Sequence, residues 1–323
     1  MSRQPITVIS NAKSGTAKRA EIDSTLQAEF AKYGAEARIV LVEQGSQLID
    51  AARKAIADGC RTLVAAGGDG TINAVASVVL EESAKGRDVV LGVLPMGTLN
   101  HFAKDLGIPL DLEEAVRVVV EGVVREVDVG EVNGKTFVNN SSLGIYPTLV
   151  LEREQLQRLG RSKWSAFTAA MLTVLGRYPL VKVAIEIDGR QISRKTPLVF
   201  IGNNKYLIEG LRLGKRDRLD EGTLSVFMTR DVGRAKLFWF ALRALFGKLR
   251  EERDFDALET TALRVQMRGK HVRISADGEI DRLEIPLEYR IRPKALRVVA
   301  PAGAPIPKAS AAEAVLVAKV EHA

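Results

Sequence analysis

The sequence predicts two domains: an α/β domain built on a parallel sheet, followed by a mostly β, sandwich-like domain. In residues 1–130 short apolar runs alternate with amphipathic helical patterns, and from about residue 131 apolar side chains instead alternate with period two. Strands that alternate with helices form parallel sheets covered on both faces, whereas period-two strands form antiparallel sheets with one buried face. A chain of 323 residues is long enough for two such cores.

The first domain is expected to contain four strands and four helices. The expected strands are residues 6–9, 36–42, 63–66 and 89–94, and the expected helices are residues 22–30, a helix from residue 46, residues 71–82 and a helix from residue 111. Ser46 is a candidate N-cap, and the segment that opens with Asp111 has the pattern of a capping box. Sheets of this kind bind ligands beyond the carboxyl ends of their strands, so a site is expected in the loops there.

The second domain is expected to consist mainly of short antiparallel strands. They are expected near residues 136–141, 181–187, 196–203, 223–229, 262–267, 272–276 and 283–291, interrupted by helices near 152–177 and 233–250. We expect the α/β domain to span residues 1–130 and to be rejoined by residues 292–303, with the β-rich domain at 131–291. The Pro- and Ala-rich residues 304–323 are expected to be a flexible tail.

Composition narrows the classes of function. The net charge of +7 favours an anionic partner such as a membrane surface, a polyphosphate or nucleic acid, although a solvated basic surface explains it equally well. No apolar run reaches the length of a membrane span, and the start of the chain does not read as a secretory signal. A single cysteine, Cys60, cannot form an intramolecular disulfide, favours a cytoplasmic protein and is expected to be a packed thiol. Three histidines without a Cys/His cluster argue against zinc chemistry.

Glycine-bearing loops follow three of the expected strands. Residues 67–71 (GGDGT) lie between a buried strand and a helix, where glycine lets the backbone approach a phosphate and the helix N-terminus favours an anion. Residues 10–15 (SNAKSG) follow the first strand, and residues 94–100 (LPMGTLN) follow the fourth. A glycine turn between strand and helix is often only structural. Three such loops at one edge of a sheet, however, predict a nucleotide site.

These segments resemble the diacylglycerol kinase catalytic family, which includes sphingosine and ceramide kinases and bacterial lipid kinases. The likeness rests on residues 67–71, residues 11–15, the GTxNxFA segment at 97–103 and a late Asp277-Gly278-Glu279. The GGDGT signature is shared with NAD kinases and more loosely with phosphofructokinases. The GTxNxFA segment favours lipid kinases. The resemblance implies a nucleotide cleft between an NAD-kinase-like α/β domain and a β-sandwich domain.

The resemblance also implies roles for individual residues. Asp277 would be the general base on the lipid hydroxyl, with Glu279 assisting through Mg²⁺ or by orientation, although an Asp-Gly pair is by itself the signature of a hairpin turn. Asp217 and Asp220 would hold a structural Mg²⁺, where the default is an acidic turn. His101 stands where the family commonly has Asp. The nucleotide-binding residues implied are Asn11, Lys13, Ser14, Gly15, Gly67, Gly68, Asp69, Gly70, Thr71, Asn73, Gly97, Thr98 and Asn100.

The expected function is ATP- and Mg²⁺-dependent phosphorylation of a membrane lipid alcohol, with diacylglycerol first and a ceramide or sphingoid base as the alternative. NAD phosphorylation and a non-catalytic lipid- or nucleotide-binding module are less favoured, and a nucleic-acid partner is not expected. Residues 234–250 combine apolar and basic side chains, so this stretch and residues 152–177 either lie on an anionic membrane or pack internally. We therefore expect a cytoplasmic protein attached peripherally to the membrane. The sequence leaves a homodimer open.

Overall fold

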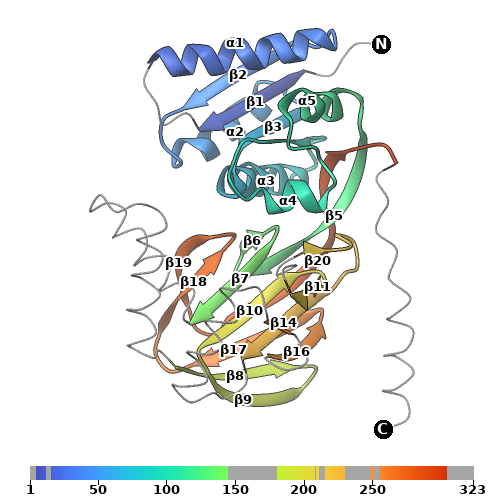
Figure 1. Ribbon diagram of the computed structural model, residues 1–323. Helices are drawn as coiled ribbons and strands as arrows, with labels where there is room; N and C mark the ends of the chain where they lie inside the picture. The colour runs from blue at the N-terminus through green and yellow to red at the C-terminus, as the bar shows by residue number, and fades with distance from the viewer. Residues whose placement is uncertain are drawn as a thin grey trace.

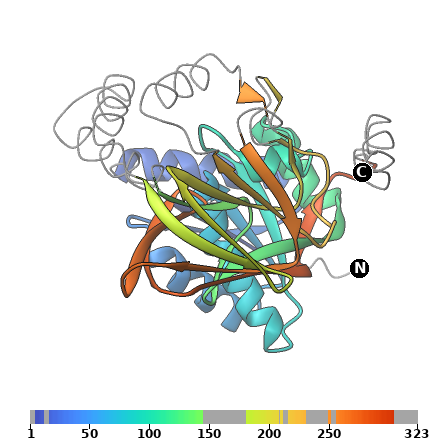
Figure 2. The same cartoon turned by 90° about the horizontal axis from the view of Figure 1, so that it is seen from below.

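A computed structural model describes residues 5–11, 16–144, 180–207, 209–210, 215–229, 249–250 and 255–303 of the chain. An α/β domain lies at one end of the molecule and a β domain at the other (Figure 1). Seen from the β end, the strands of the β domain lie across the α/β domain behind them (Figure 2). The predicted fold class, a parallel α/β domain plus a sandwich-like β domain, is confirmed.

The α/β domain is built on four parallel strands in the order β2-β1-β3-β4. They are β1 (Ile6–Asn11), β2 (Ala37–Val42), β3 (Thr62–Gly67) and β4 (Val90–Pro95). The helices are α1 (Thr16–Lys32), α2 (Gln47–Ala57), α3 (Asp69–Ala84), the short α4 (His101–Asp105) and α5 (Leu112–Glu121). Helix α1 packs beside α5, and α2 packs beside α3. The central strands β3 and β4 are buried and consist mainly of apolar residues, as expected for a sheet covered on both faces.

Two of the expected helix caps behave differently. The Asp111 side chain accepts a hydrogen bond from Glu114 N at 3.1 Å and caps α5, as predicted. Ser46 is the N-cap residue of α2, as predicted, but its side chain makes no cap hydrogen bond. The backbone amides of Glu43 and Gln44, just before α2, instead donate to the Gln47 side chain at 3.0 and 3.1 Å.

The β domain packs two antiparallel layers against each other. One is a six-stranded sheet in the order β16-β14-β10-β7-β18-β19, and the other continues from the parallel sheet through β20, β17, β8 and β9, with β5 and β6 alongside. The strands are β5 (Val123–Val132), β6 (Lys135–Phe137), β7 (Asn140–Gly144), β8 (Val181–Ile187), β9 (Arg190–Thr196), β10 (Leu198–Asn203), β14 (Leu224–Thr229), β16 (Phe255–Thr260), β17 (Ala262–Met267), β18 (His271–Ala276), β19 (Glu279–Glu284) and β20 (Leu287–Ala300). Alternate side chains of β8 and β17 are buried between the layers, which is the period-two pattern that the sequence predicted.

Strand β20 belongs to both domains. Its first residues pair with β17, and further along Val298 lies beside Leu91 of β4 in parallel, while β5 runs antiparallel to it over both parts. A bulge at Lys294 (φ 51°) separates the two parts. The buried Asp128 carboxylate of β5 accepts a bond from Lys294 N at 2.7 Å and another from Gly222 N at 2.6 Å. The two domains are therefore joined by paired backbone and not by a free linker.

Several expectations concern residues that the structure does not describe. The helix expected at 152–177, most of the helix expected at 233–250 and the tail at 304–323 lie outside the described residues. Leu249–Arg250 is described, and it forms the short strand β15, paired with β12 (Glu209–Gly210), so a helix through residue 250 is wrong. Among the described helices, none is both long and apolar enough to cross a bilayer.

Candidate active site at the carboxyl edge of the parallel sheet

The start of helix α3 is an open anion-binding position. Strand β3 ends at Gly67, and Gly68 is the N-cap residue with φ −88° and ψ −177°, so the N-cap residue has no side chain to cap the helix. The backbone bond from Ile72 N to Gly68 O (3.0 Å) begins the helical ladder. The amides of residues 69–71 precede this bond, and they point out of the helix N-terminus together with its partial positive charge. A phosphate is the kind of group such a terminus binds.

A second glycine loop, after β4, packs directly against the first. A Cβ added to Gly97 would lie 2.4 Å from Gly68 Cα, so only glycine fits there. Asn100, in the left-handed conformation (φ 51°), closes its own loop: Oδ1 accepts from Gly97 N at 3.0 Å, and Nδ2 donates to Gly97 O at 2.9 Å. The amide of Met96 also donates to Gly67 O at 3.0 Å. The structure thus brings together two of the three predicted loops, residues 67–71 and 94–100.

Polar side chains of these loops take distinct positions. The Asp69 carboxylate accepts a bond from Phe102 N at 3.4 Å, which links α3 to α4. Thr71 is buried against Gly67, where an added Cβ would lie 2.6 Å from Thr71 Oγ1. Thr98 is exposed at the tip of its loop, and His101 is exposed at the first residue of α4. Among the described residues, no hydrogen bond holds the side chain of Thr98 or His101 in a position that would define a role.

Two buried amides at this edge carry acceptor oxygens without a hydrogen-bond partner in the described part of the chain. They are Oδ1 of Asn11, at the end of β1, and Oδ1 of Asn73, one turn into α3. Asn73 is only 5% exposed. Buried polar atoms are nearly always paired, so these two oxygens beside the start of α3 are candidates to bond a polar ligand. Lys13, Ser14 and Gly15 lie outside the described residues.

Asp277 lies in the hairpin between β18 and β19, opposite this edge. Its carboxylate accepts three backbone bonds, from Val138 N (2.7 Å), Asn139 N (2.8 Å) and Asn140 N (3.0 Å). The hairpin is the Asp-Gly turn that the sequence indicated, with φ 48° at Asp277 and 85° at Gly278. Asp188 has the same turn geometry (φ 49°, followed by 73° at Gly189), but its side chain is exposed. The turn therefore does not by itself require a buried carboxylate.

Burial raises the pKa of Asp277 to about 6, against the opposing effect of the three backbone N–H groups and the Arg216 guanidinium. A carboxylate has about four acceptor positions, and Asp277 uses two on Oδ1 and one on Oδ2. The remaining position on Oδ2 can accept a hydrogen bond from a substrate hydroxyl. A carboxylate with this pKa is ionised at neutral pH and basic enough to take part in proton transfer.

Glu279 reaches across to the first turn of α3. A Cβ added to Gly70 would lie 3.6 Å from Glu279 Oε1, and the Glu279 side chain is 52% exposed. Burial raises its pKa, Lys135 lowers it and Asp281 raises it. Lys135 is ion-paired with Asp281, and its Nζ lies 3.8 Å from Glu279 Oε2. A carboxylate at an anion-binding helix start repels a phosphate unless a cation lies between them, so this position suits Mg²⁺.

The acidic segment at 217–222 does not form a metal cage among the described residues. Arg218 makes a two-pronged ion pair with Asp220, Nε to Oδ1 at 2.9 Å and a terminal nitrogen to Oδ2 at 3.1 Å. Within the described ranges, no group of three or more acidic, His or Cys side chains is arranged to hold a metal. The described residues therefore give Asp217 and Asp220 no third acidic, His or Cys ligand, and the Mg²⁺ site there stays a prediction.

The site depends on buried polar residues that the sequence did not indicate. Arg216 stands in a run of charges that reads as a solvated turn, and Asp105 stands on a short helix among ordinary surface residues. Their burial arises from long-range contacts, so no local signal could have identified them. The buried polar residues that the sequence did not indicate are Asp105, Asp128, Asn139, Asn203 and Arg216.

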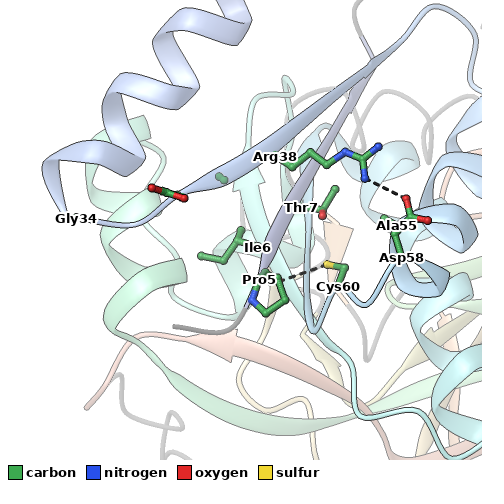
Figure 3. Close-up of a pocket in the computed structure, with 10 residues that line it drawn as sticks. Pro5, Ile6, Thr7, Gly34, Arg38, Ala55, Asp58 and Cys60 are labelled. Atoms are coloured by element: carbon green, nitrogen blue, oxygen red, sulfur yellow. Dashed lines mark hydrogen bonds and ion pairs between the residues drawn. The ribbon is translucent and has the colours of Figure 1, made fainter. Parts of the chain in front are cut away.

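A separate cavity of about 610 Å³ lies at the opposite, amino edge of the sheet (Figure 3). Two of its charged groups, Arg38 and Asp58, are paired with each other at 3.0 Å, and Glu36 also lines it. The thiol of Cys60 lies 3.1 Å from Thr62 O and 3.7 Å from Pro5 O. Burial raises the pKa of Cys60, so the cysteine is a packed thiol, as expected, and not a nucleophile.

Comparison with known proteins identifies the family. The profile of the diacylglycerol kinase catalytic domain matches residues 5–132, and that of the YegS C-terminal NAD kinase beta sandwich-like domain matches residues 150–300. The chain belongs to the diacylglycerol kinase family. Both glycine loops lie in the first matched region, and Asp277 and Glu279 lie in the second. The family is one of lipid kinases, so the chain is a phosphotransferase enzyme.

Relatives of the family agree along most of the chain. The diacylglycerol kinase of Staphylococcus carnosus is 26% identical over 73% of this chain and 76% of its own length. That of Staphylococcus aureus strain JH9 is 28% identical over 73% of each chain. A crystal structure of a diacylglycerol kinase from Bacillus anthracis superposes with a TM-score of 0.67 at 19% identity and covers 93% of this chain and 98% of its own. At that identity the structural likeness concerns the fold.

Proposed function

We propose that the chain transfers the γ-phosphoryl group of ATP to the hydroxyl of a membrane lipid, with diacylglycerol as the leading acceptor. The observation that carries this proposal is the meeting of two unlike groups across the domains. A helix start without an N-cap side chain, suited to a phosphate, faces Glu279 at Gly70, and Asp277 stands in the same hairpin. Phosphoryl transfer needs positioned phosphates, neutralised charge and a group that accepts the proton of the attacking hydroxyl.

The α/β domain would hold the nucleotide. Glycines in both loops allow the backbone to approach the phosphates closely, and the free amides at the start of α3 donate to them. The buried amides of Asn11 and Asn73 would pair with further polar groups of the nucleotide. The proposed set is Asn11, Lys13, Ser14, Gly15, Gly67, Gly68, Asp69, Gly70, Thr71, Asn73, Gly97, Thr98 and Asn100.

Asp277 would act as the general base. Three backbone N–H groups hold its carboxylate in one orientation and leave one position on Oδ2 for the acceptor hydroxyl. As the oxygen of that hydroxyl forms a bond to the γ-phosphorus, the bond from that phosphorus to the β–γ bridging oxygen breaks and ADP leaves. The proton of the hydroxyl passes to Oδ2. The raised pKa of about 6 makes Asp277 a better proton acceptor than an ordinary aspartate while keeping it ionised at pH 7.

Glu279 would hold a Mg²⁺ ion, which supplies charge neutralisation to the phosphoryl group in transfer. Its half-exposed carboxylate beside Gly70 is the observation that fits this role. Lys135 is ion-paired with Asp281, and its Nζ lies 3.8 Å from Glu279 Oε2.

The acceptor is proposed from the relatives, which are named as diacylglycerol kinases at 26–28% identity. A ceramide or sphingoid base is the second acceptor to test. Peripheral attachment to an anionic membrane, through residues 152–177 and 234–248 outside the described part of the chain, would bring a lipid headgroup to Asp277. The net charge of +7 supports such attachment.

Radiolabelled ATP and Mg²⁺, with vesicles containing each acceptor in turn, test the proposal. The panel is diacylglycerol, monoacylglycerol, ceramide and sphingosine in phosphatidylglycerol vesicles, with NAD in solution. We expect label in the organic phase with diacylglycerol, dependent on Mg²⁺ and absent when Asp277 is replaced. Label transferred only to NAD would contradict the lipid acceptor. ATP binding without transfer to any acceptor would contradict catalysis.

A further inference from the structure

A buried arginine links the two halves of the proposed site. Arg216, at the end of β13 (Lys215–Arg216), has a fully buried side chain, and Asp105 at the end of α4 is 5% exposed. Arg216 Nε donates to Asp105 Oδ2 at 2.8 Å. The ion pair therefore joins the α/β domain to the β domain away from water.

The same guanidinium also holds the segment that binds Asp277. One terminal nitrogen donates to Asn139 Oδ1 at 2.7 Å, and the other donates to Val138 O at 2.6 Å and to Asn203 O at 3.1 Å. The ring of Tyr206 lies 5.3 Å from the guanidinium carbon. The amides of Val138 and Asn139 are two of the three that donate to the Asp277 carboxylate. Arg216 thus sets the position of the peptide groups that orient the proposed base.

On the other side, Asp105 belongs to the element that follows the second glycine loop. Asn100 closes that loop and is the N-cap residue of α4, and its carbonyl accepts a hydrogen bond from Lys104 N at 3.1 Å. A continuous path of bonds therefore runs from Gly97 and Asn100 through α4 to Asp105, and then through Arg216 and Asn139 to Asp277.

We infer that the Asp105–Arg216 pair is an interdomain latch, and that both are positioning residues that hold the Asp277 carboxylate at a set distance from the nucleotide loops. This inference deepens the proposed function and rests on it. Neither side chain touches the reacting atoms in this scheme. The latch acts by fixing the separation between the base and the phosphates, a quantity to which transfer rates are steeply sensitive.

An arginine suits this role better than a lysine or an apolar pair. Its planar fork makes bonds in several fixed directions at once, whereas a lysine ammonium is a point charge. A buried ion pair contributes little net stability compared with packed apolar side chains, and its best-attested use is to specify one arrangement over others. Holding two domains in a single register is such a use.

The test compares three single variants of the full-length protein with the wild type. Asp105→Asn keeps the shape of the side chain and an oxygen for Nε but removes the charge. Arg216→Lys keeps the charge but cannot reach Asp105 and Asn139 together, so it serves if Asp105→Asn does not fold. Asp58→Asn is the matched control, because Asp58 pairs with Arg38 at the far edge of the same sheet.

Hydrogen exchange tests the latch without relying on catalysis. In Asp105→Asn we expect peptides covering residues 97–107 and 136–142 to exchange faster together, by at least about threefold, and neither to change in Asp58→Asn. Faster exchange in residues 97–107 alone would overturn the latch, because it would show that the two segments are not coupled.

Kinetics separate positioning from a purely structural role. Activity is measured at a temperature where circular dichroism shows the variants folded. In Asp105→Asn and Arg216→Lys we expect kcat to fall roughly 10–100-fold while the Kd for ATP stays within about threefold. A folded Asp105→Asn protein with wild-type kcat, or with kcat and ATP affinity lost in parallel, would overturn the inference. A wild-type protein that phosphorylates no lipid sinks the kinase proposal instead, and the exchange experiment still decides the coupling.

Discussion

The two edges of the parallel sheet make an instructive contrast. The amino edge has a cavity of about 610 Å³, yet Arg38 and Asp58 in its lining are paired with each other and its thiol is buried and hydrogen-bonded. The carboxyl edge has a helix start without an N-cap side chain, two buried amide oxygens without partners among the described residues and two carboxylates from the other domain. Unpaired hydrogen-bonding groups, and not the cavity at the amino edge, therefore mark the candidate site.

The reason for the difference lies in how parallel sheets are built. At the carboxyl ends of the strands the helices begin, so their free amides and positive dipole ends gather on one edge. At the amino ends of the strands the helices finish, and side chains there pair with each other, as Arg38 does with Asp58. If this contrast is correct, changes at the carboxyl edge should abolish transfer and changes at the amino edge should leave it intact.

The largest effect is expected for Asp277→Asn. The amide cannot accept the proton, so kcat should fall by about 10²–10⁴-fold. Because the carboxylate accepts three backbone bonds, its replacement also sets an NH₂ group against a backbone donor, at a cost of about 1–3 kcal/mol in the free energy of unfolding. Steady-state kinetics below the unfolding transition, with urea denaturation alongside, measure the two effects separately.

Asp188→Asn is the control for this variant, since Asp188 occupies an equivalent Asp-Gly turn with an exposed side chain. It should keep wild-type kcat. If Asp277→Asn kept wild-type kcat, as Asp188→Asn should, Asp277 would be only a turn residue and the general base would be removed from the proposal.

The next largest effect is expected for Gly97→Ala. Its methyl group would lie 2.4 Å from Gly68 Cα and 2.7 Å from Asn100 Oδ1, so the two glycine loops must move apart. Forcing an extra carbon into a packed position costs about 1–3 kcal/mol. Expressed as lost affinity, this is roughly ten- to hundredfold weaker ATP binding, measurable by calorimetry.

Gly45 provides the comparison, because an added Cβ there meets nothing within 4 Å. Gly45→Ala should bind ATP as the wild type does. Unchanged affinity in Gly97→Ala would mean that the phosphates are bound elsewhere than at the meeting of the two loops.

A smaller effect is expected from pH. Because Asp277 must be ionised to accept a proton and its pKa is about 6, kcat should fall about tenfold per pH unit below pH 6. The folded pKa lies above the ordinary value of 3.8, so this group stabilises the fold at low pH and loses that contribution as pH rises through 6. The acid loss of activity should therefore occur without unfolding caused by Asp277. A pH profile with the same acidic limb in Asp277→Asn would assign the limb to another group.

Sequence reasoning succeeded where the chemistry is local. Each of the loops 67–71 and 97–100 is a short continuous segment. Its turn follows from the strand before it and the helix after it. The Asp-Gly hairpin at Asp277 was likewise readable as a turn. In each case the backbone conformation depends on a few adjacent residues, so the local sequence was enough to predict the turn.

Sequence reasoning failed where the chemistry is assembled over distance. The bonds that orient Asp277 come from residues 138–140, and the arginine behind them comes from a charged run that looks solvated. Within that run, Arg216 is buried, whereas Arg218 pairs with Asp220. Neighbouring residues of one type thus take opposite environments, and only the packing of β13 against α4 decides between them.

The smallest effect is expected at the amino edge, for Cys60→Ala. Removing a buried sulfur that is 6% exposed should lower the free energy of unfolding by about 1 kcal/mol, but kcat/KM should stay within about twofold of the wild type. Since burial raises the pKa of Cys60, the native wild-type protein should also react only slowly with a thiol reagent and rapidly once unfolded. Ellman's reagent with and without urea measures this, and Asp58→Asn repeats the activity test at the same edge. Loss of activity in either variant would show that the amino edge contributes to transfer, and the contrast between the two edges would no longer hold.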